Sequence, residues 1–301
     1  MINKSKEHII EKGLFCAALA QVLVIILIGF FVFKEGFPIL QKYGVISFLF
    51  GETWNPTNKI YGIYPMIIGT IVVTVGSLVI GIPLGVATAI FLAEIVPEKI
   101  GRYFRPAIEL LAGIPSVIYG LFGMVLVKNI VLYIERQFLH DILPPEYQWG
   151  YSILTASIIL SVMILPTIIN ISEDAIRSVP LEYKEGSLAL GATHWQTIYR
   201  VLVPAARSGI LAAIVLGMGR ALGETMAVIM VAGNTVAVPK LSLWGIFAPV
   251  RTLTGNIALE MGYATPEHQQ ALFATGIVLF IFIMILNLIA GQIARKGVNN
   301  S

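Results

Sequence analysis

Six long stretches of apolar residues run through this chain, and they limit its possible folds more than any other feature. Each stretch is long enough for a helix to cross a hydrocarbon core of about 30 Å. The apolar residues are continuous and do not alternate with polar ones, which favours transmembrane helices over the strands of a membrane barrel. We therefore predict an all-α integral membrane protein with six transmembrane helices, at residues 13–33, 63–93, 107–127, 150–172, 208–233 and 271–294.

The composition excludes an ordinary soluble protein. Hydrophobic residues make up 57% of the 301 residues and charged residues only 12%, whereas soluble domains have about 25% charged residues. The net charge of +3 is too small to indicate nucleic-acid binding. The single cysteine, Cys16, lies inside the first apolar stretch, so neither an internal disulfide nor a metal site is expected.

The distribution of lysine and arginine predicts which loops face the cytoplasm. The N-terminal tail, the 94–106 loop, the 173–207 loop and the tail after residue 294 hold 12 of these residues. The other three loops hold seven over a greater length. Because basic residues are enriched on the cytoplasmic side, both termini are expected there. The first apolar stretch is longer than the core of a signal peptide, and we expect it to remain as an anchor.

Two charged residues, Arg220 and Glu224, lie deep in the fifth apolar stretch. An arginine at the centre of a transmembrane helix costs about 2.5 to 3.5 kcal/mol, so it usually faces a protein or water-filled interior. In one continuous helix the two side chains would share a face and neutralise each other. Such a pair could simply join this helix to a neighbour. Alternatively, Arg220 lies on a transport path for an anion, and Glu224 balances its charge until the anion arrives.

The 173–207 loop is predicted to contain two short helices. Ser178 is a candidate cap for the first, with Pro180 in its opening turn. Gly191 offers the left-handed residue that ends a helix. Residues 193–196 have the spacing of a capping box at the start of the second helix.

The second of these helices carries an apolar stripe. Trp195, Ile198, Tyr199 and Leu202 follow helical spacing, and Pro204 ends the helix. A stripe of this kind in a loop indicates a covering partner. An amphipathic helix resting on lipid headgroups is the alternative.

The same loop resembles the EAA loop of ABC-importer permeases. Glu185-Gly186-Ser187, then Gly191, then Val-Leu-Val-Pro ending at Pro204 match that family's spacing, with small or apolar replacements at several positions. In the family this loop forms a coupling helix that fits a cleft on the ATPase subunit. The resemblance therefore implies the following coupling residues: Glu185, Gly186, Ser187, Gly191, Trp195 and Pro204.

Two further stretches, residues 113–123 and 219–228, resemble the phosphate-importer permeases, and the second is closer to the PstC type than to the PstA type. The resemblance covers about residues 63–294 and implies the ABC type I importer permease fold for that domain. Residues 1–62 would hold the N-terminal tail, the first span and an extracytoplasmic segment, and residues 295–301 a cytoplasmic tail. The resemblance also assigns Arg220 and Glu224 to the phosphate path.

The partners implied by this resemblance are a second permease of the PstA type, two ATPase subunits and an extracytoplasmic phosphate-binding protein. The binding protein would meet segments 34–62, 128–149 and 234–270. Their aromatic residues suit such contacts, although an interfacial aromatic belt would look the same. These residues are Phe37, Tyr43, Trp54, Tyr61, Trp149 and Trp244. The four histidines, His8, His140, His194 and His268, fall in terminal or loop segments where solvated or docking roles are expected.

The chain is thus expected to be a permease subunit that translocates inorganic phosphate across the cytoplasmic membrane of a prokaryote. It contains no G-x-x-x-x-G-K-[ST] motif, so we expect ATP with Mg²⁺ to bind the partner ATPase. This chain itself is expected to bind no cofactor and to be no enzyme. A permease for another oxyanion, such as sulfate or molybdate, is one alternative. A proton-coupled carrier would need relays of intramembrane acids and histidines, but Glu224 is the only such residue in mid-span. A membrane scaffold without a pathway is a third alternative, and the charged pair Arg220 and Glu224 argues against it.

Overall fold

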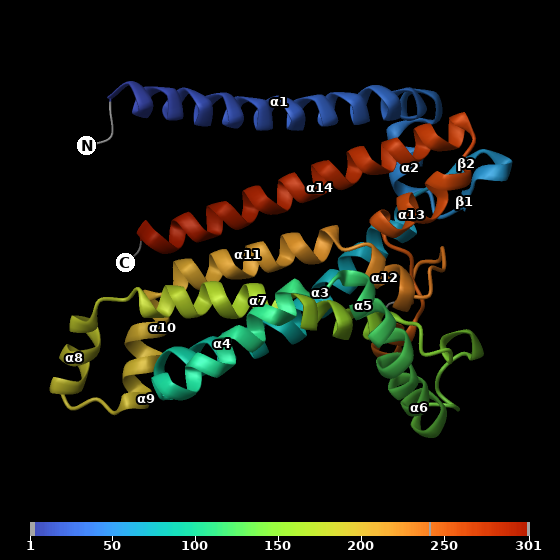
Figure 1. Cartoon of the computed structure of the whole chain (residues 1–301). Coiled ribbons are helices and arrows are strands. Elements are labelled where there is room, and N and C mark those ends of the chain that lie inside the picture. Colours follow the sequence, from blue (N-terminus) through green and yellow to red (C-terminus); the bar gives the residue numbers. More distant parts are fainter. Residues whose placement is uncertain (1–3, 241, 300–301) are drawn as a thin grey trace.

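The computed structural model describes residues 4–240 and 242–299, and most of them are helical (Figure 1). Five helices in this part are long and apolar enough to cross a membrane: Ile10–Tyr43, Tyr64–Ile95, Ser116–Phe138, Ile153–Arg177 and Pro266–Ile289. A pair of helices, His194–Ala205 and Arg207–Gly223, forms a sixth candidate that is bent by 67° at its junction. The predicted number of six spans is confirmed when this pair counts as one.

The spans are built from long helices and short π-helical turns. Their bounds are α1 (Lys4–Tyr43), α3 (Tyr64–Ile90) with η2 (Phe91–Ile95), α5 (Ser116–Phe122), η3 (Gly123–Val127), α6 (Lys128–Phe138), α7 (Ile153–Arg177), α11 (Arg207–Gly223) and α14 (Pro266–Asn299).

Shorter elements connect the spans. They are α2 (Val45–Phe50), α4 (Glu98–Gly113), α8 (Leu181–Ala189), α9 (His194–Thr197), η5 (Ile198–Leu202), α10 (Val203–Ala205), α12 (Met226–Val231), α13 (Leu253–Glu260) and the 3-10 turns η1 (Pro56–Asn58), η4 (Pro145–Tyr147), η6 (Leu243–Phe247) and η7 (Met261–Tyr263). Strands β1 (Trp54–Asn55) and β2 (Ile60–Tyr61) pair antiparallel, with Trp54 opposite Tyr61.

Helix α7 is the centre of the bundle. Two thirds (67%) of its most apolar window is buried inside the protein, against none of that of α1. Helix α3 packs closely on it at Gly81 and Gly85, where an added Cβ would lie 2.9 Å from Ile164 and 2.7 Å from Ile168. The two glycines, one turn apart, therefore allow the close backbone approach that apolar helices use in membranes.

Helix α1 lies at the edge of the bundle and is longer than the predicted span. It contacts α14 near its C-terminal half, through the edge-on ring pair Phe31–Phe273 and through Gly36, and then diverges toward the N-terminus (Figure 1). The predicted tail after residue 294 continues α14 to Asn299, and residues 300–301 lie outside the described part.

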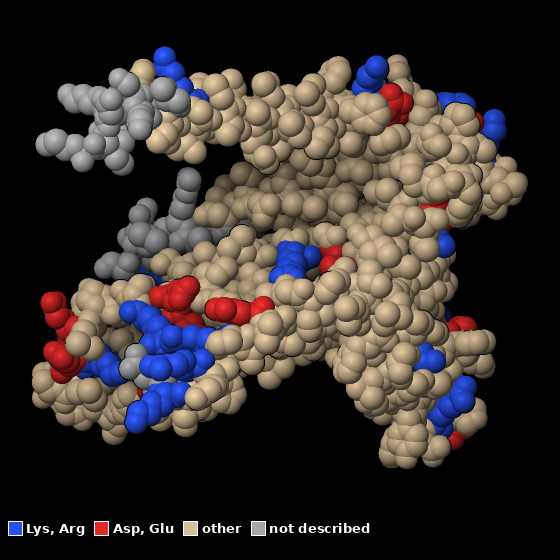
Figure 2. All heavy atoms as spheres, in the orientation of Figure 1, with Lys and Arg blue, Asp and Glu red and all other residues tan. Residues whose placement is uncertain are grey.

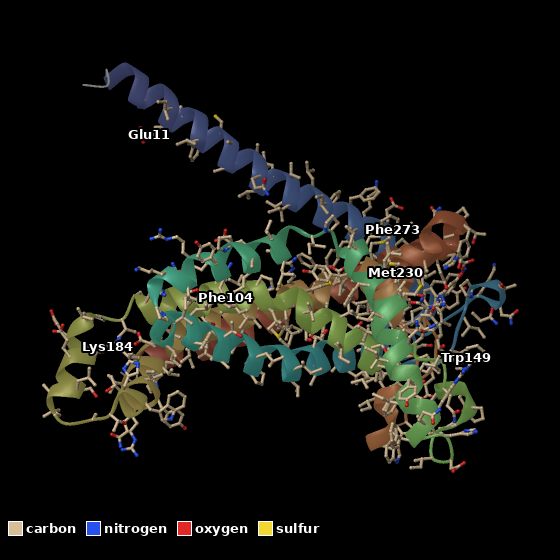
Figure 3. The ribbon with its side chains drawn as sticks, turned by 60° about the horizontal axis from the view of Figure 1, so that its bottom comes forward. Glu11, Phe104, Trp149, Lys184, Met230 and Phe273 are labelled. Carbon is tan, nitrogen blue, oxygen red and sulfur yellow. The ribbon has the colours of Figure 1, made fainter. Side chains whose placement is uncertain are left out.

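Both termini and helices α8 to α10 lie at the same end of the molecule (Figure 1). Basic side chains gather at this end over α4, α8 and α9, together with acidic ones (Figure 2). In the view of Figure 3, Lys184 on α8 and Trp149 lie at opposite ends. The termini and helices α8 to α10 therefore share one end of the bundle, and the assignment of this end to the cytoplasm stays a prediction.

The third predicted span is displaced. Residues 107–113 belong to α4, which mixes charged and apolar residues, and the chain is extended at Ile114 (φ −70°, ψ 127°). Pro115 explains the break, because a proline disfavours helical backbone in the residue before it and has no N–H to donate. The span therefore starts at Ser116 and continues to Phe138, so the predicted extracytoplasmic segment 128–149 begins as helix.

Candidate functional site

The predicted single helix over residues 208–233 is wrong. Helix α11 ends at Gly223, and Glu224 is extended (φ −70°, ψ 130°) before α12 begins at Met226. Gly223 is a weak helix former, and the polar groups of Glu224 find partners elsewhere. Its carboxylate accepts from the Ala227 N–H (3.2 Å), and its backbone carbonyl accepts from the Thr254 hydroxyl (3.2 Å).

The predicted ion pair between Arg220 and Glu224 does not form. Arg220 lies in the last turn of α11 and is half-buried. Its Nη1 donates to the Thr167 hydroxyl on α7, at 3.5 Å, and no carboxylate pairs with it within residues 4–240 and 242–299. The break after Gly223 explains this, because the two side chains no longer follow one helix. Arg220 is left as a cation beside a hydroxyl, and a guanidinium so placed can bind an oxyanion through charge-assisted hydrogen bonds.

The local predictions for the coupling loop are partly confirmed. Gly191 adopts a left-handed conformation (φ +84°) just after α8. The capping box is present, with the Thr193 hydroxyl accepting from the Gln196 N–H and the Gln196 side chain accepting from the Thr193 N–H. Ser178 does not cap α8, because its hydroxyl donates to the Ala175 carbonyl at the end of α7. Helix α7 extends through residue 177 into the predicted loop.

The four residues of the predicted apolar stripe do not share one environment, because two are buried and two are exposed. Ile198 and Leu202 are 1% and 3% exposed, whereas Trp195 and Tyr199 are 64% and 70% exposed. The helix also continues past Pro204 to Ala205 before it bends. Pro204 cannot donate a hydrogen bond to the preceding turn, and that turn, Ile198–Leu202, is a π-helix.

The inner half of the loop is fixed to the transmembrane core by polar contacts. Lys184 pairs with Glu94 at 2.6 Å, and the His194 ring lies 3.3 Å from the Glu94 carbonyl. The Ser187 and Thr197 hydroxyls, 2.9 Å apart, join α8 to α9. The outer half is left as an exposed apolar surface, here called the coupling surface, made of Leu181, Tyr183, Leu190, Trp195 and Tyr199. The predicted residues Glu185, Gly186 and Gly191 are exposed at the same end.

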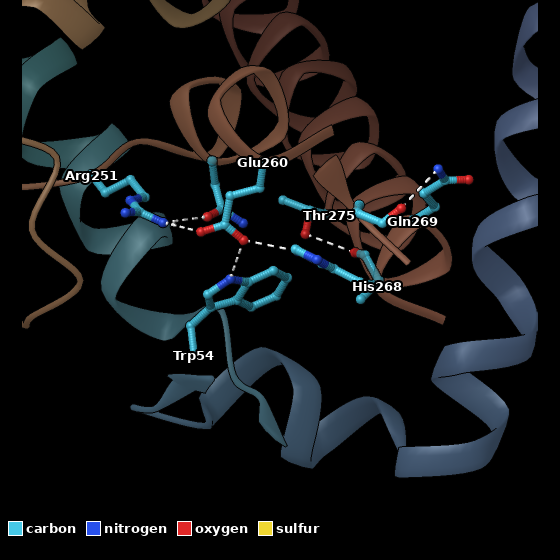
Figure 4. A network of polar contacts seen from close by, with 9 residues as sticks. Trp54, Arg251, Glu260, His268, Gln269 and Thr275 are labelled. Carbon is cyan, nitrogen blue, oxygen red and sulfur yellow. Dashed lines mark hydrogen bonds and ion pairs between the residues drawn. The ribbon is translucent and has the colours of Figure 1, made fainter. Parts of the chain in front are cut away.

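A buried polar cluster at the opposite end was missed by the sequence reasoning (Figure 4). The Glu260 carboxylate accepts from Trp54 Nε1 (2.7 Å) and Arg251 Nη1 (2.5 Å), and His268 Nε2 lies 2.8 Å from it. We call these four residues the Glu260 cluster. Arg251 also donates to the Asn234 carbonyl at 3.0 Å. A buried carboxylate needs such partners because it cannot be solvated.

The Glu260 cluster corrects two predictions. Trp54 and Tyr61, expected to face a binding protein, are only 8% and 5% exposed. His268, expected in a solvated or docking role, is buried. Trp149 remains exposed, as the docking hypothesis requires. In the sequence, these residues are visible only as polar or aromatic side chains near the predicted ends of spans. That position does not indicate which of them contact one another.

Comparison with known proteins decides the family. Residues 81–297 match the family described as "Binding-protein-dependent transport system inner membrane component". The chain belongs to this family. Its members are transport components, so the chain is a permease subunit and not an enzyme, and the family argues against the proton-coupled carrier. The start of the match lies inside α3; the predicted domain boundary at residue 62 stays a prediction.

The curated relatives span nearly the whole chain. The sequence is 41% identical to the probable ABC transporter permease protein YqgH of Bacillus subtilis, over 91% of this chain and 88% of that protein. It is 36% identical to the phosphate transport system permease protein PstC of Mesorhizobium japonicum, over 90% of this chain and 85% of the relative.

Solved structures support the fold alone. The chain is similar to a bacterial ABC transporter involved in alginate import, with a TM-score of 0.62, 17% identity and coverage of 98% and 99% of the two chains. It is also similar to the inward-facing MetNI methionine ABC transporter, with a TM-score of 0.60, 18% identity and coverage of 81% and 99%. The ABC type I importer permease fold is therefore confirmed for this multi-pass inner-membrane protein.

Proposed function

We propose that this chain is a membrane subunit of an ATP-driven importer that carries inorganic phosphate into the cell. Several relatives named as phosphate transport permeases support the choice of substrate, including those of Mesorhizobium japonicum (36% identity) and Xylella fastidiosa (35% identity). The identities extend over 90% and 96% of this chain. Similarity over nearly the whole chain and the chemistry at Arg220 both support phosphate as the substrate.

The observation that carries this proposal is the guanidinium of Arg220, which pairs with no carboxylate in the part of the chain that the structure describes. It lies roughly 20 Å along α11 from the first residue of that helix, at 1.5 Å per residue. A charged side chain this far along a transmembrane helix is energetically unfavourable unless water, protein or a ligand compensates its charge. Phosphate would supply that compensation, because its oxygens match the planar fork of a guanidinium. Thr167 offers a hydroxyl beside the same position.

Glu224 would limit how tightly phosphate is held. Its carboxylate lies at the start of α12, on the extracytoplasmic side of Arg220 in the proposed orientation. An anion that passes it experiences repulsion, while Arg220 attracts it. A path needs a site that binds strongly enough to admit the ion and weakly enough to release it.

The remaining parts of the importer are assigned to partner chains. ATP with Mg²⁺ would bind two ATPase subunits, one of which docks on the coupling surface and on Glu185–Gly191 of this chain. A second permease of the PstA type completes the pathway, and a phosphate-binding protein docks at the end that carries Trp149. With both termini cytoplasmic, the coupling surface faces the ATPases.

Uptake by the full transporter, expressed with its partner subunits, tests the proposed function. Cells lacking other phosphate importers should accumulate labelled phosphate at low external concentration, and excess unlabelled sulfate or molybdate should not compete. Uptake of labelled sulfate or molybdate in place of phosphate would overturn the choice of substrate. Uptake that persists after a lysine substitution in the ATPase phosphate loop would overturn ATP coupling.

A further inference from the structure

Helix α13 connects the Glu260 cluster to the break at Glu224. Its last residue is Glu260, and its eight residues span roughly 12 Å. At its other end, the Thr254 hydroxyl donates to the Glu224 carbonyl at 3.2 Å. The neighbouring Leu253 N–H donates to the Thr70 hydroxyl on α3 at 2.9 Å. Both ends of this short helix are therefore held by hydrogen bonds that are buried or partly buried.

The hydroxyl of Thr254 supplies a hydrogen-bond donor to a backbone carbonyl that the helix break leaves without an intrahelical partner. Because α11 ends at Gly223, the Glu224 carbonyl has no further turn of that helix to bond with. Thr254 is 8% exposed and gives this carbonyl a fixed partner. The backbone at Glu224 determines where its carboxylate lies, so a contact on the carbonyl also places the side chain.

We propose that Thr254 is a positioning residue for Glu224, and that the Glu260 cluster holds α13 in the place from which Thr254 acts. This inference rests on the proposed function, in which Glu224 lies on the phosphate path. It also links the hairpin of β1 and β2, which contains Trp54, to the phosphate path through α13. Movement of the hairpin would shift α13 and, with it, the carbonyl of Glu224.

Substitution of Thr254 in the full transporter tests the proposal. Thr254→Val keeps the shape of the side chain and removes the donor, and it also removes the contact between this hydroxyl and the Thr252 hydroxyl at 3.2 Å. It should lower the maximal rate of phosphate uptake roughly two- to tenfold, the range for a lost hydrogen bond. The half-saturating phosphate concentration should not change, because the proposed binding protein would set it. Thr254→Ser restores the donor and should recover the rate.

Thr275→Val is the matched control. Thr275 is fully buried, and among the described residues its hydroxyl bonds only to the Ala271 carbonyl of its own helix. This variant loses a buried hydroxyl without touching Glu224, so its uptake should match the parent at equal amounts of protein in the membrane. An equal loss of rate in both variants would show a general packing effect and overturn the proposal.

Combination with Glu224→Gln separates positioning from stability. If Thr254 acts through the carboxylate, Thr254→Val should cause no further loss of rate once that carboxylate is gone. Additive losses would overturn the proposal, as would a parent-like rate for Thr254→Val alone. If the parent itself fails to take up phosphate, the proposed function fails and this inference fails with it.

Discussion

The guanidinium of Arg220 on α11 donates to the hydroxyl of Thr167 on α7, with Nη1 3.5 Å from Oγ1. Thr167 directly follows Pro166, whose ring removes one N–H from the hydrogen-bond ladder of α7. The two side chains come from adjacent helices in the centre of the bundle. Their contact predicts that Thr167 helps to define the site at which Arg220 meets its anion.

Removal of the Thr167 hydroxyl should weaken transport without abolishing it. Thr167→Val keeps the shape and is expected to reduce phosphate uptake roughly two- to tenfold, the range for one lost hydrogen bond. Thr167→Ser should remain close to the parent. The measurement is initial uptake normalised to the amount of transporter in the membrane. A Thr167→Ser variant as slow as Thr167→Val would show that packing of the methyl group matters instead.

Gly191 should tolerate no side chain. Its φ of +84° costs an L-residue about 1–2 kcal/mol, although nothing lies within 4 Å of an added Cβ. Gly191→Ala should therefore shift the end of α8 and reduce uptake, and Gly191→Arg should abolish it while insertion remains normal. Gly101→Ala is the control, because Gly101 is helical and its nearest contact would be 3.9 Å away. Normal uptake by Gly191→Arg would contradict the assigned coupling role.

Substitutions at the exposed and at the buried residues of the predicted apolar stripe should have different effects. Trp195→Ala and Tyr199→Ala remove exposed side chains and should leave the stability of the chain unchanged while uncoupling ATP hydrolysis from transport. Ile198→Ala removes a buried side chain and should lower the free energy of unfolding by about 2–5 kcal/mol. Thermal unfolding of the purified chain and ATPase activity of the complex distinguish the two effects. Loss of stability in Trp195→Ala would show that this residue packs inward.

The Glu260 cluster should stabilise the outer end of the protein. Trp54→Phe keeps an aromatic ring but leaves one carboxylate contact unmade, which costs about 1–3 kcal/mol. Protease sensitivity of the hairpin and the unfolding temperature report this loss. Trp149→Phe is the control, since Trp149 is 66% exposed and donates to no carboxylate in the described residues. Equal stability of the two variants would contradict a stabilising role for the cluster.

The number of spans and two local motifs could be predicted because they depend on neighbouring residues. Continuous hydrophobicity is a property of each stretch, so the sequence alone indicates which stretches enter the membrane. The left-handed Gly191 and the capping box at Thr193 follow from local backbone preferences. These features require no knowledge of which segments pack together.

The details of the site could not be predicted because they depend on distant contacts. The break at Glu224 is stabilised in part by Thr254, thirty positions later in the chain. The burial of Trp54 depends on Glu260, 206 positions away. One apolar stretch looks the same whether its helix is continuous or broken, so Arg220 and Glu224 were expected to pair although they do not.

The charge of Glu224 should control release and not entry. Glu224→Gln removes the repulsion that opposes tight binding at Arg220, so turnover should fall while uptake remains measurable. Single-turnover and steady-state uptake, measured on the same reconstituted complex, separate the two steps. An unchanged steady-state rate in the Glu224→Gln transporter would show that this carboxylate plays no part in the pathway.

Phosphate uptake by the Arg220→Gln transporter tests most directly whether this cation lies on the path. We expect uptake to be abolished while the complex assembles normally, and Arg220→Lys to rescue poorly because an ammonium lacks the planar fork. The double variant Arg220→Gln with Glu224→Gln should also fail, since neutralising the acid does not replace the lost anion contact. Parent-like uptake by Arg220→Gln, or by the double variant, would contradict the pathway and leave Arg220 a purely structural residue.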